Sequence, residues 1–389
     1  MKKLIYFSTS IVPSKYANSV HVMKMCEALA QTGQNVTLLC IKNKNENVDI
    51  FPHYGVEKIF DIKFFPMLKI PGNNLYNPLT VLSAGIYLLV CSIYILFDRS
   101  ASVYTRDPYG AFALAMLGQK FVWEIHELPS SKFKNFLFTK VLKSNAVVMI
   151  VCISEKMKSL LFSQFGFIEN YVKTMVAHDG ATPSNEILKP RYELRKELDL
   201  PQNSFMAGYT GNLFSGRGIE LIFEIAEKLQ DVTFVIVGGH DEDLTRLRGI
   251  LEKGSFSNID LHGFQPPYLI PSYLKAFDIL LMPYQKKVSL RGNKRDTSEF
   301  MSPMKMFEYM ASGKPIISSR LPVLMEVLNH EHNALLAGPD VASEWVLAVT
   351  LLKENRQLGE RLAAKAREDV MNYTWEERAG SVLKHWGIT

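Results

Sequence analysis

Residues 183–201, PSNEILKPRYELRKELDLP, divide this chain into two halves that repeat one pattern. On both sides of this polar connector, short apolar runs rich in β-branched residues alternate with longer stretches of helical periodicity. That alternation is typical of parallel βαβ units. The sequence therefore predicts an α/β protein with two doubly wound, Rossmann-like domains, and a short charged helix inside the connector.

The predicted strands form two series. The first half has strands near residues 3–8, 35–41, 102–106, 120–126, 146–153 and 172–178, with helices such as 19–32 and 155–165 between them. The second half has strands near residues 205–210, 232–238, 258–263, 278–283 and 315–319. Ligands of doubly wound sheets bind at the carboxyl ends of strands, so the residues that follow these runs are the candidates for chemistry.

The composition agrees with two globular domains. The 389 residues are 47% apolar and 21% charged, which excludes a disordered protein. The net charge of +5 is too small for a dedicated nucleic-acid binder, although it favours anionic ligands or an anionic membrane surface. The four cysteines (Cys26, Cys40, Cys91 and Cys152) are scattered, so we expect neither a disulfide framework nor a zinc site. We expect a cytoplasmic location.

The uncharged run Leu79–Phe97, LTVLSAGIYLLVCSIYILF, is long enough to span a bilayer. Spanning would separate the predicted strands at 3–8 and 35–41 from those at 102–106 and 120–126, although all four look like members of one sheet. We therefore expect a buried helix, or a helix that lies partly in the membrane interface. Aromatic and lysine residues at 64–70 and 132–140 favour peripheral contact of the first domain with an anionic membrane.

The most informative motif is SPMKMFEYMASGKP, residues 302–315. Ser302 is a suitable N-cap, Pro303 suits the first helical position, and Gly313 is placed to end the helix. A helix start attracts phosphate, and Glu308 projects on the adjoining face, four residues after Met304. A carboxylate beside a phosphate suits the two hydroxyls of a ribose. The alternative is that Glu308 only caps a surface helix.

This motif resembles the donor-site motif of the retaining GT-B glycosyltransferases of family 4, and the resemblance extends over nearly the whole chain. Family members carry Glu-x7-Glu, ending in EAMA or EYMA and followed by G-x-P. Glu308 matches the second glutamate, which the resemblance implies binds the nucleotide ribose. The first glutamate is expected at position 300, where this chain has Phe300, and Glu299 lies one residue early. The donor-binding candidates in this region are Glu299, Ser302, Pro303, Met304 and Glu308.

A second motif, YTGNLFSGRGIE at residues 209–220, follows the first predicted strand of the second half. It is neither a Walker A sequence nor a dinucleotide fingerprint. A glycine-rich turn that enters a helix can nevertheless hold a pyrophosphate, and Arg217 supplies a fixed cation. The alternative is an ordinary βα turn with a solvated arginine.

The same segment resembles the family's G-x-L-x(3)-KG element. Arg217 stands in place of the usual lysine, and Asn212 occupies a place that arginine often holds. One of the two expected diphosphate cations is therefore missing, and Lys305 is the candidate to replace it. Gly211, Asn212 and Gly216 are further donor-binding candidates.

In the first half, WEIHELP at residues 123–129 ends a predicted strand and places His126 and Glu127 at its carboxyl end. His126 is similar to the family's strand-end histidine that approaches the donor sugar, although a lone histidine is usually structural. The loop at residues 10–22, SIVPSKYANSVHV, resembles the family's acceptor-side loop. The acceptor-side candidates are thus Asn18, His21 and Glu127, with helix capping as the alternative role of Asn18.

The resemblance implies a retaining glycosyltransferase of the hexosyltransferase type with the GT-B fold, in which two domains face a central cleft. It implies transfer from a nucleotide-diphosphate sugar to a glycan or lipid-linked acceptor in cell-surface polysaccharide synthesis. The departing diphosphate calls for cations and N–H dipoles, which makes Arg217 and Lys305 catalytic candidates. His126 is the third catalytic candidate, because the resemblance implies that it approaches the donor sugar. No acidic pair follows a strand in a metal-binding place, so we expect neither a metal nor a cofactor.

The domain organisation expected from this resemblance has three parts. Residues 1–183 form the acceptor-side domain, 184–369 bind the nucleotide sugar, and 370–389 form a closing helix that packs back on the first domain. Two alternatives remain: a non-hydrolysing sugar-nucleotide epimerase of the same architecture, and a non-catalytic protein that binds sugar nucleotides.

Overall fold

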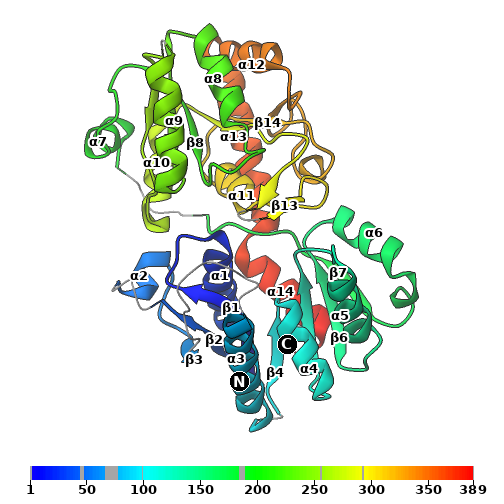
Figure 1. The fold of residues 1–389 in the computed structure, drawn as a ribbon. Helices are drawn as coiled ribbons and strands as arrows, with labels where there is room; N and C mark the ends of the chain where they lie inside the picture. The colour runs from blue at the N-terminus through cyan, green and yellow to red at the C-terminus, as the bar shows by residue number, and fades with distance from the viewer. Residues whose placement is uncertain are drawn as a thin grey trace. The chain divides into compact units, whose positions relative to one another are not determined.

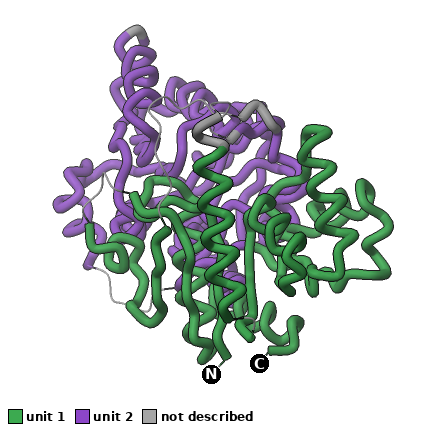
Figure 2. Tube along the Cα trace, turned by 60° about the horizontal axis from the view of Figure 1, so that its bottom comes forward, with its two compact units in different colours: residues 1–178, 375–389 green, residues 179–374 purple. Residues whose placement is uncertain are grey.

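The computed structural model describes the whole chain except residues 1, 44–47, 66–77, 99, 184–188, 255, 291–292 and 389. The chain forms two compact units, one of residues 1–178 with 375–389 and the other of residues 179–374 (Figure 2). The first boundary thus lies at 178/179 rather than at 183/184, because the Ala181 backbone already pairs with Tyr373 and Thr374 of the second unit. The return begins at 375 rather than 370, because the 3-10 helix Val370–Tyr373 packs in the core of the second unit.

The first unit is built on a seven-stranded parallel sheet, in the order β3-β2-β1-β4-β5-β6-β7 (Figure 1). Its strands are β1 (Lys3–Val12), β2 (Asn35–Lys42), β3 (Asp61–Phe65), β4 (Ser102–Thr105), β5 (Phe121–Ile125), β6 (Val147–Cys152) and β7 (Lys173–Val176). All except β3 were predicted. The edge strand β3 was not predicted, because its DIKFF sequence is only partly buried and carries no uninterrupted apolar run.

Seven helices belong to the described part of this unit. They are α1 (Ala17–Gln31), α2 (Ile50–Tyr54), α3 (Pro78–Leu96), α4 (Pro108–Met116), α5 (Lys132–Leu142), α6 (Glu155–Gln164) and α14 (Trp375–Trp386), with a 3-10 turn at Gly166–Ile168. The last helix, α14, packs against α1, and the Gln34 side chain donates to the Ile388 carbonyl at 3.4 Å. The end of the chain is therefore an integral part of the first unit.

The second unit contains a six-stranded parallel sheet, in the order β10-β9-β8-β11-β14-β15. Its strands are β8 (Phe205–Thr210), β9 (Val232–Val237), β10 (Ile259–Leu261), β11 (Ile279–Met282), β14 (Ile316–Ser319) and β15 (Leu335–Ala337). A separate antiparallel hairpin joins β12 (Ser289–Leu290) and β13 (Asn293–Asp296). Strand β15 and the hairpin were not predicted, because each strand is short and the hairpin is polar.

The helices of the second unit cover both faces of its sheet (Figure 1). They are α7 (Arg191–Glu197), α8 (Ile219–Lys228), α9 (Asp241–Lys253), α10 (Ile270–Ala276), α11 (Met304–Ala311), α12 (Ala342–Glu354) and α13 (Arg356–Asp369), with 3-10 turns at Pro267–Leu269 and Leu324–Glu326. Helix α7 is the charged helix predicted in the connector. The predicted α/β class with two doubly wound sheets is confirmed.

Each sheet reverses its strand order once, at β1/β4 in the first unit and at β8/β11 in the second. At such a point the loops on either side diverge, which opens a crevice at the carboxyl ends of the strands. These two edges are therefore the places where a ligand site is expected.

The apolar run in the first half forms helix α3. Among the described residues, no helix is both long enough and apolar enough to cross a membrane. One face of α3 packs on the unit through residues that include Tyr87, Cys91 and Ile95, and the Tyr87 hydroxyl donates to the Ser8 carbonyl. The opposite face exposes large apolar side chains. Complete burial, one of the two expectations for this run, is therefore wrong.

Candidate functional site

The two donor motifs predicted from the sequence meet where the strand order of the second unit reverses. Strand β8 leads into Gly211, β11 leads into Tyr284, and α11 carries Lys305 to the same place. A Cβ atom on Gly211 would lie 2.9 Å from Lys305 Nζ, and the φ of Gly211 is +131°. Only glycine therefore lets the lysine lie against the backbone at this turn.

Two cations lie on the aromatic rings that line this edge. Lys305 Nζ is 3.7 Å from the ring centroid of Tyr209 and 5.3 Å from that of Tyr284. The Arg217 guanidinium carbon is 5.0 Å from the Tyr284 centroid, and Arg217 Nη1 donates to the Tyr284 hydroxyl at 2.9 Å. One tyrosine thus holds both cations, in the arrangement expected for cation–π contacts.

Both cations carry a buried nitrogen with unused hydrogen-bonding capacity. Within the described part of the chain, nothing accepts a hydrogen bond from Lys305 Nζ or from Arg217 Nε. Burial, together with the nearby Arg217 charge, holds the pKa of Lys305 well below its usual range, against the opposing effect of Glu308. A buried cationic group without acceptors is costly, so this place favours an anion that brings oxygen atoms.

Helix α11 is attached to the end of β8 next to these cations. The Thr210 backbone N–H donates to the Tyr309 hydroxyl at 2.8 Å, which fixes the helix against the strand end. Glu308 precedes Tyr309 and raises the pKa values of both Tyr284 and Lys305, so its carboxylate lies near the cation pair. The predicted neighbourhood of Glu308, Arg217 and Lys305 is therefore present in the second unit.

The start of α11 differs from the prediction. The N-cap residue is Pro303 and the helix begins at Met304, so the prediction that Ser302 caps the helix is wrong. The Ser302 hydroxyl instead accepts from the Asp179 N–H at 2.9 Å, which ties it to the beginning of the unit. The predicted end of the helix is confirmed, because Gly313 follows the C-cap with φ +68°.

The remaining donor candidates have different surroundings. Glu299 is exposed, and the buried Phe300 beside it lies in the apolar interior. The Asn212 carbonyl accepts from the Tyr209 hydroxyl at 2.6 Å, which orders the turn after β8. A Cβ atom on Gly216 would lie 1.9 Å from the Lys287 carbonyl oxygen, so this glycine permits close approach of two loops. The structure therefore gives Gly216 a packing role.

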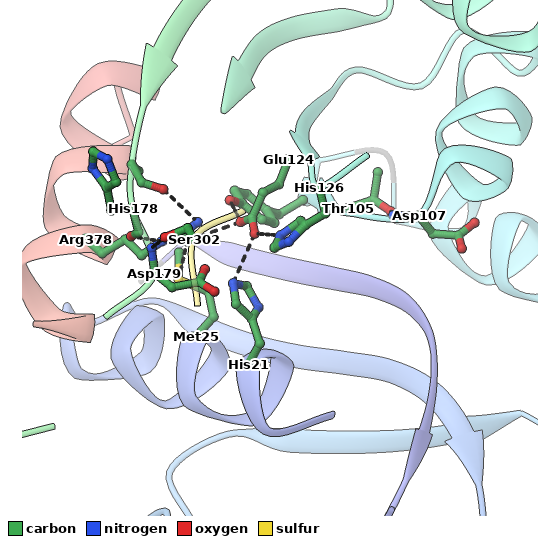
Figure 3. Close-up of polar contacts among 12 residues, drawn as sticks. His21, Met25, Thr105, Asp107, Glu124, His126, His178, Asp179, Ser302 and Arg378 are labelled. Carbon is green, nitrogen blue, oxygen red and sulfur yellow. Dashed lines mark hydrogen bonds and ion pairs between the residues drawn. The ribbon is translucent and has the colours of Figure 1, made fainter. Parts of the chain in front are cut away.

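A second polar cluster lies in the first unit around Glu124, a fully buried residue of β5 (Figure 3). Its Oε1 atom lies 3.1 Å from His21 Nε2 and also contacts His126 Nε2. Its Oε2 atom accepts from Arg378 Nη1 at 3.1 Å and from the Tyr104 hydroxyl. The sequence reasoning missed Glu124, although a carboxylate inside the apolar strand FVWEI was a usable signal.

The charge states in this cluster follow from its burial. Burial and the Arg106 charge lower the pKa of His126 to about 4, although Glu124 opposes them. Burial would raise the pKa of Glu124, but Arg378, His21 and His126 together hold it well below its usual range. At neutral pH the cluster therefore contains a neutral His126 and an ionised Glu124.

His21, Glu124 and His126 each offer one ligand atom, and these three atoms lie within 4.8 Å of one another, a grouping that could hold a metal ion. Two features favour a hydrogen-bonded network instead. The carboxylate already contacts four donor groups, and the Arg378 guanidinium would repel a second cation. The absence of a metal requirement stays a prediction.

The acceptor-side candidates do not all join this cluster. His21 is buried within it and contacts the His126 ring edge-on, with centroids 5.0 Å apart. Asn18 donates to the Ser10 hydroxyl at 3.2 Å, and the N-cap of α1 is Tyr16, so capping by Asn18 is wrong. Glu127 pairs with Lys134 on α5 at 2.8 Å. Of the three candidates, His21 therefore belongs to the Glu124 cluster, whereas Asn18 bonds Ser10 and Glu127 pairs with Lys134.

Comparison with known proteins finds a family match within the second unit. Residues 190–369 match the protein family described as "Glycosyl transferases group 1". An uncharacterized glycosyltransferase of Methanocaldococcus jannaschii is 21% identical over 95% of this chain and 94% of its own length. A 2-deoxystreptamine glucosyltransferase of Streptomyces kanamyceticus (24% identical, 50% of this chain) and the Escherichia coli O-antigen biosynthesis glycosyltransferase WclY (23%, 47% of this chain) match partly. This chain spans about half the length of each of those two proteins, 48% and 47% respectively.

Solved structures show the same fold over the whole length. A sucrose-phosphate synthase of Thermosynechococcus elongatus superposes with a TM-score of 0.76 at 16% identity, covering 100% of this chain and 98% of the other. The Anabaena protein HepE, in complex with UDP-glucose, superposes with a TM-score of 0.73 at 14% identity, covering 99% and 100%. At these identities the likeness establishes the fold.

Proposed function

We propose that the second unit is a group 1 glycosyl transferase domain and that the chain is a glycosyltransferase of the GT-B fold. We infer that it is a retaining, hexosyltransferase-type enzyme of family 4. It moves a sugar from a nucleotide-diphosphate sugar to a glycan or lipid-linked acceptor. The relative named for O-antigen biosynthesis supports a role in cell-surface polysaccharide synthesis.

The observation that supports this proposal is the pair Arg217 and Lys305 at the ends of β8 and β11, each with a buried nitrogen that donates no hydrogen bond to the described residues. When the bond between sugar and phosphate breaks, negative charge develops on the diphosphate. Cations already in place, and not solvated by water, stabilise that charge at little reorganisation cost. Arg217 meets this requirement in the free protein, Lys305 meets it once donor binding has restored its proton, and the Anabaena protein with the same fold binds UDP-glucose.

The proposed roles of the other residues follow from their places. Glu308 binds the two ribose hydroxyls, while the turn with Gly211 and Asn212 and the helix start from Ser302 to Met304 approach the diphosphate. Glu299 and Gly216 are weaker donor contacts, since one is exposed and the other packs a loop. In the first unit, His126 contacts the donor sugar, with Asn18, His21 and Glu127 on the acceptor side. We propose that the reaction needs no metal and no cofactor.

The experiment that tests this proposal is incubation with UDP-, GDP- and ADP-sugars, with and without a membrane lipid extract. A glycosyltransferase releases free nucleoside diphosphate from one donor, and the release depends on acceptor. An epimerase converts the sugar nucleotide to an isomer without acceptor-dependent release of nucleotide. A non-catalytic binding protein leaves every donor unchanged, and that result would overturn the proposal.

Donor binding is expected to take up a proton at Lys305. In the free protein its pKa is lowered by burial and by Arg217, and a diphosphate beside it would raise the pKa again. The affinity for nucleoside diphosphate therefore falls as pH rises through the window between the free and bound pKa values. Calorimetric titration in two buffers with different ionisation heats measures this uptake.

The matched variant for this test is Lys305→Met, which keeps the length of the side chain and removes the titrating group. It should bind nucleoside diphosphate more weakly and take up less proton than the wild type. Identical binding heats in both buffers for the wild type would contradict proton uptake at Lys305.

We also propose peripheral contact with the inner face of an anionic membrane, through α3, α4 and α5; residues 66–70 of the contact predicted from the sequence lie outside the described residues. Helix α4 packs between α3 and α5, so the three form one continuous surface. Their large exposed apolar residues are Leu82, Ile86, Leu89, Val90, Ile93, Tyr109, Met116, Phe133 and Phe136. The sequences of these helices contain no Asp or Glu, and α5 contributes three lysines. Apolar side chains with basic neighbours suit insertion among anionic headgroups.

Liposome flotation tests this surface. The wild type is expected to float with anionic vesicles at low salt and not with neutral ones, since each lysine near such a surface adds about 1 kcal/mol. The double variant Leu82→Gln, Leu89→Gln should float poorly, because these side chains are 60% and 58% exposed. Leu347→Gln, at a residue of α12 that is 69% exposed, is the control. Equal flotation of both variants, or none by the wild type, would remove the membrane proposal.

A further inference from the structure

We propose that Glu124 and Arg378 are positioning residues that hold the His126 imidazole in a single tautomer. In that tautomer Nε2 donates to the carboxylate, and Nδ1 is left to accept a hydrogen bond from a substrate hydroxyl. The nature of that substrate rests on the function proposed above. The geometry itself lies within the first unit.

The tautomer follows from the partner of Nε2. An ionised carboxylate offers only acceptors, so a ring nitrogen in contact with it must carry the proton. His126 Nε2 contacts Glu124 Oε1, and that carboxylate is held ionised chiefly by Arg378, whose Nη1 donates to it at 3.1 Å. In a neutral imidazole the proton on Nε2 leaves Nδ1 with its lone pair.

His126 is also the member of the cluster that reaches the surface. Its side chain is 18% exposed, whereas those of Glu124 and Arg378 are 0% and 2% exposed. No residue in the described ranges makes a hydrogen bond to its Nδ1 atom. The Nδ1 atom of His126 can therefore accept a hydrogen bond from a ligand at the surface, while Glu124 and Arg378 stay buried.

Arg378 connects this pair to both places where the chain passes between its two units. It lies in the first turn of α14, just after the chain re-enters the first unit at Trp375. Its Nε donates to the His178 carbonyl at 2.9 Å and its Nη2 to the Ala177 carbonyl at 3.3 Å, just before the chain leaves. One guanidinium thus fixes the exit and the re-entry of the chain to the carboxylate that orients His126.

Replacement of Glu124 by Gln is expected to reverse the tautomer. The Gln amide oxygen would face Arg378 and Tyr104, because both are donors, and its NH2 group would then face the histidines. A donor opposite Nε2 requires Nε2 to accept, so the proton moves to Nδ1 and the outward acceptor becomes a donor. A residue with only a structural role would not change this signature.

Nitrogen-15 spectra of histidine-labelled protein read the tautomer directly, and the His126→Asn spectrum assigns the signal. We expect Nε2–H in the wild type and in Arg378→Lys, and Nδ1–H in Glu124→Gln. The kcat for sugar transfer should fall by about 10- to 100-fold in Glu124→Gln with little change in donor KM, since the substrate hydroxyl can no longer donate its proton to Nδ1. Asp260→Asn, in the separate His262–Asp260 pair at 2.9 Å, is the matched control and should leave His126 and kcat unchanged.

An Nδ1–H or charged His126 in the wild type at pH 7 would overturn the proposal, whether or not the variants fold. An unchanged tautomer or an unchanged kcat in folded Glu124→Gln would overturn it too. The spectra need no substrate, so the expected tautomer in a protein without transferase activity would refute the proposed function and leave the positioning pair standing.

Discussion

Arg217→Ala should lower kcat for sugar transfer by about 100- to 1,000-fold, the usual effect of removing one preorganised donor to a developing oxyanion. Arg217 donates to the Tyr284 hydroxyl at 2.9 Å and lies over the Tyr284 ring, so it is in place before the diphosphate carries its full charge. Its contribution should therefore appear mainly in kcat, with a smaller loss of donor affinity. Initial rates over a range of donor concentration separate the two.

Arg246→Ala is the matched control for this prediction. Arg246 is exposed on α9 and pairs with Glu220 at 3.1 Å, and surface pairs of this kind contribute little. The control should keep the wild-type kcat. A large loss of donor affinity in Arg217→Ala, with kcat unchanged, would instead make Arg217 an anchor for the bound donor.

Glu308→Gln should weaken binding of nucleoside diphosphate by about 10- to 150-fold, which corresponds to 1.5–3 kcal/mol of charged hydrogen bonding. The ionised carboxylate can accept from both ribose hydroxyls, whereas the amide accepts through one oxygen only. Glu308 lies next to Tyr309, which fixes α11 to β8, so the binding geometry should survive the exchange. Calorimetric titration measures the loss.

Thermal unfolding of Glu308→Gln should match that of the wild type, because the side chain is only partly buried. Glu227→Gln, an exposed glutamate on α8, is the control and should bind nucleoside diphosphate normally. Wild-type affinity in Glu308→Gln would remove the carboxylate from the donor site.

Local sequence signals predicted most of the fold. Eleven predicted strands correspond to strands of the two sheets, because each is an apolar run between turn residues. The capping roles of Ser302 and Asn18 failed for a tertiary reason. Ser302 accepts from Asp179, 123 residues away along the chain, and Asn18 donates to Ser10. Each side chain therefore bonds a partner other than the helix end that local spacing assigned to it.

The two candidate sites differ in how far sequence could predict them. Arg217 lies in a motif that follows a strand and Lys305 in a motif that begins a helix, so both could be predicted as diphosphate ligands, although the shared Tyr284 ring could not. The partners Glu124 and Arg378 are 254 residues apart, and only the return of α14 brings them together. A carboxylate inside a strand signals a buried partner, but nothing local to β5 indicates which cation supplies it.

We propose that Arg217 and Lys305 form a diphosphate site at the carboxyl ends of β8 and β11. The most direct test is calorimetric titration of the wild type with a nucleoside, its monophosphate and its diphosphate, for uridine, guanosine and adenosine in turn. For one base, affinity should rise with each phosphate, and the terminal phosphate should add on the order of tenfold or more, as one charged hydrogen bond would. A nucleoside that binds as tightly as its diphosphate, for every base tested, would contradict the claim.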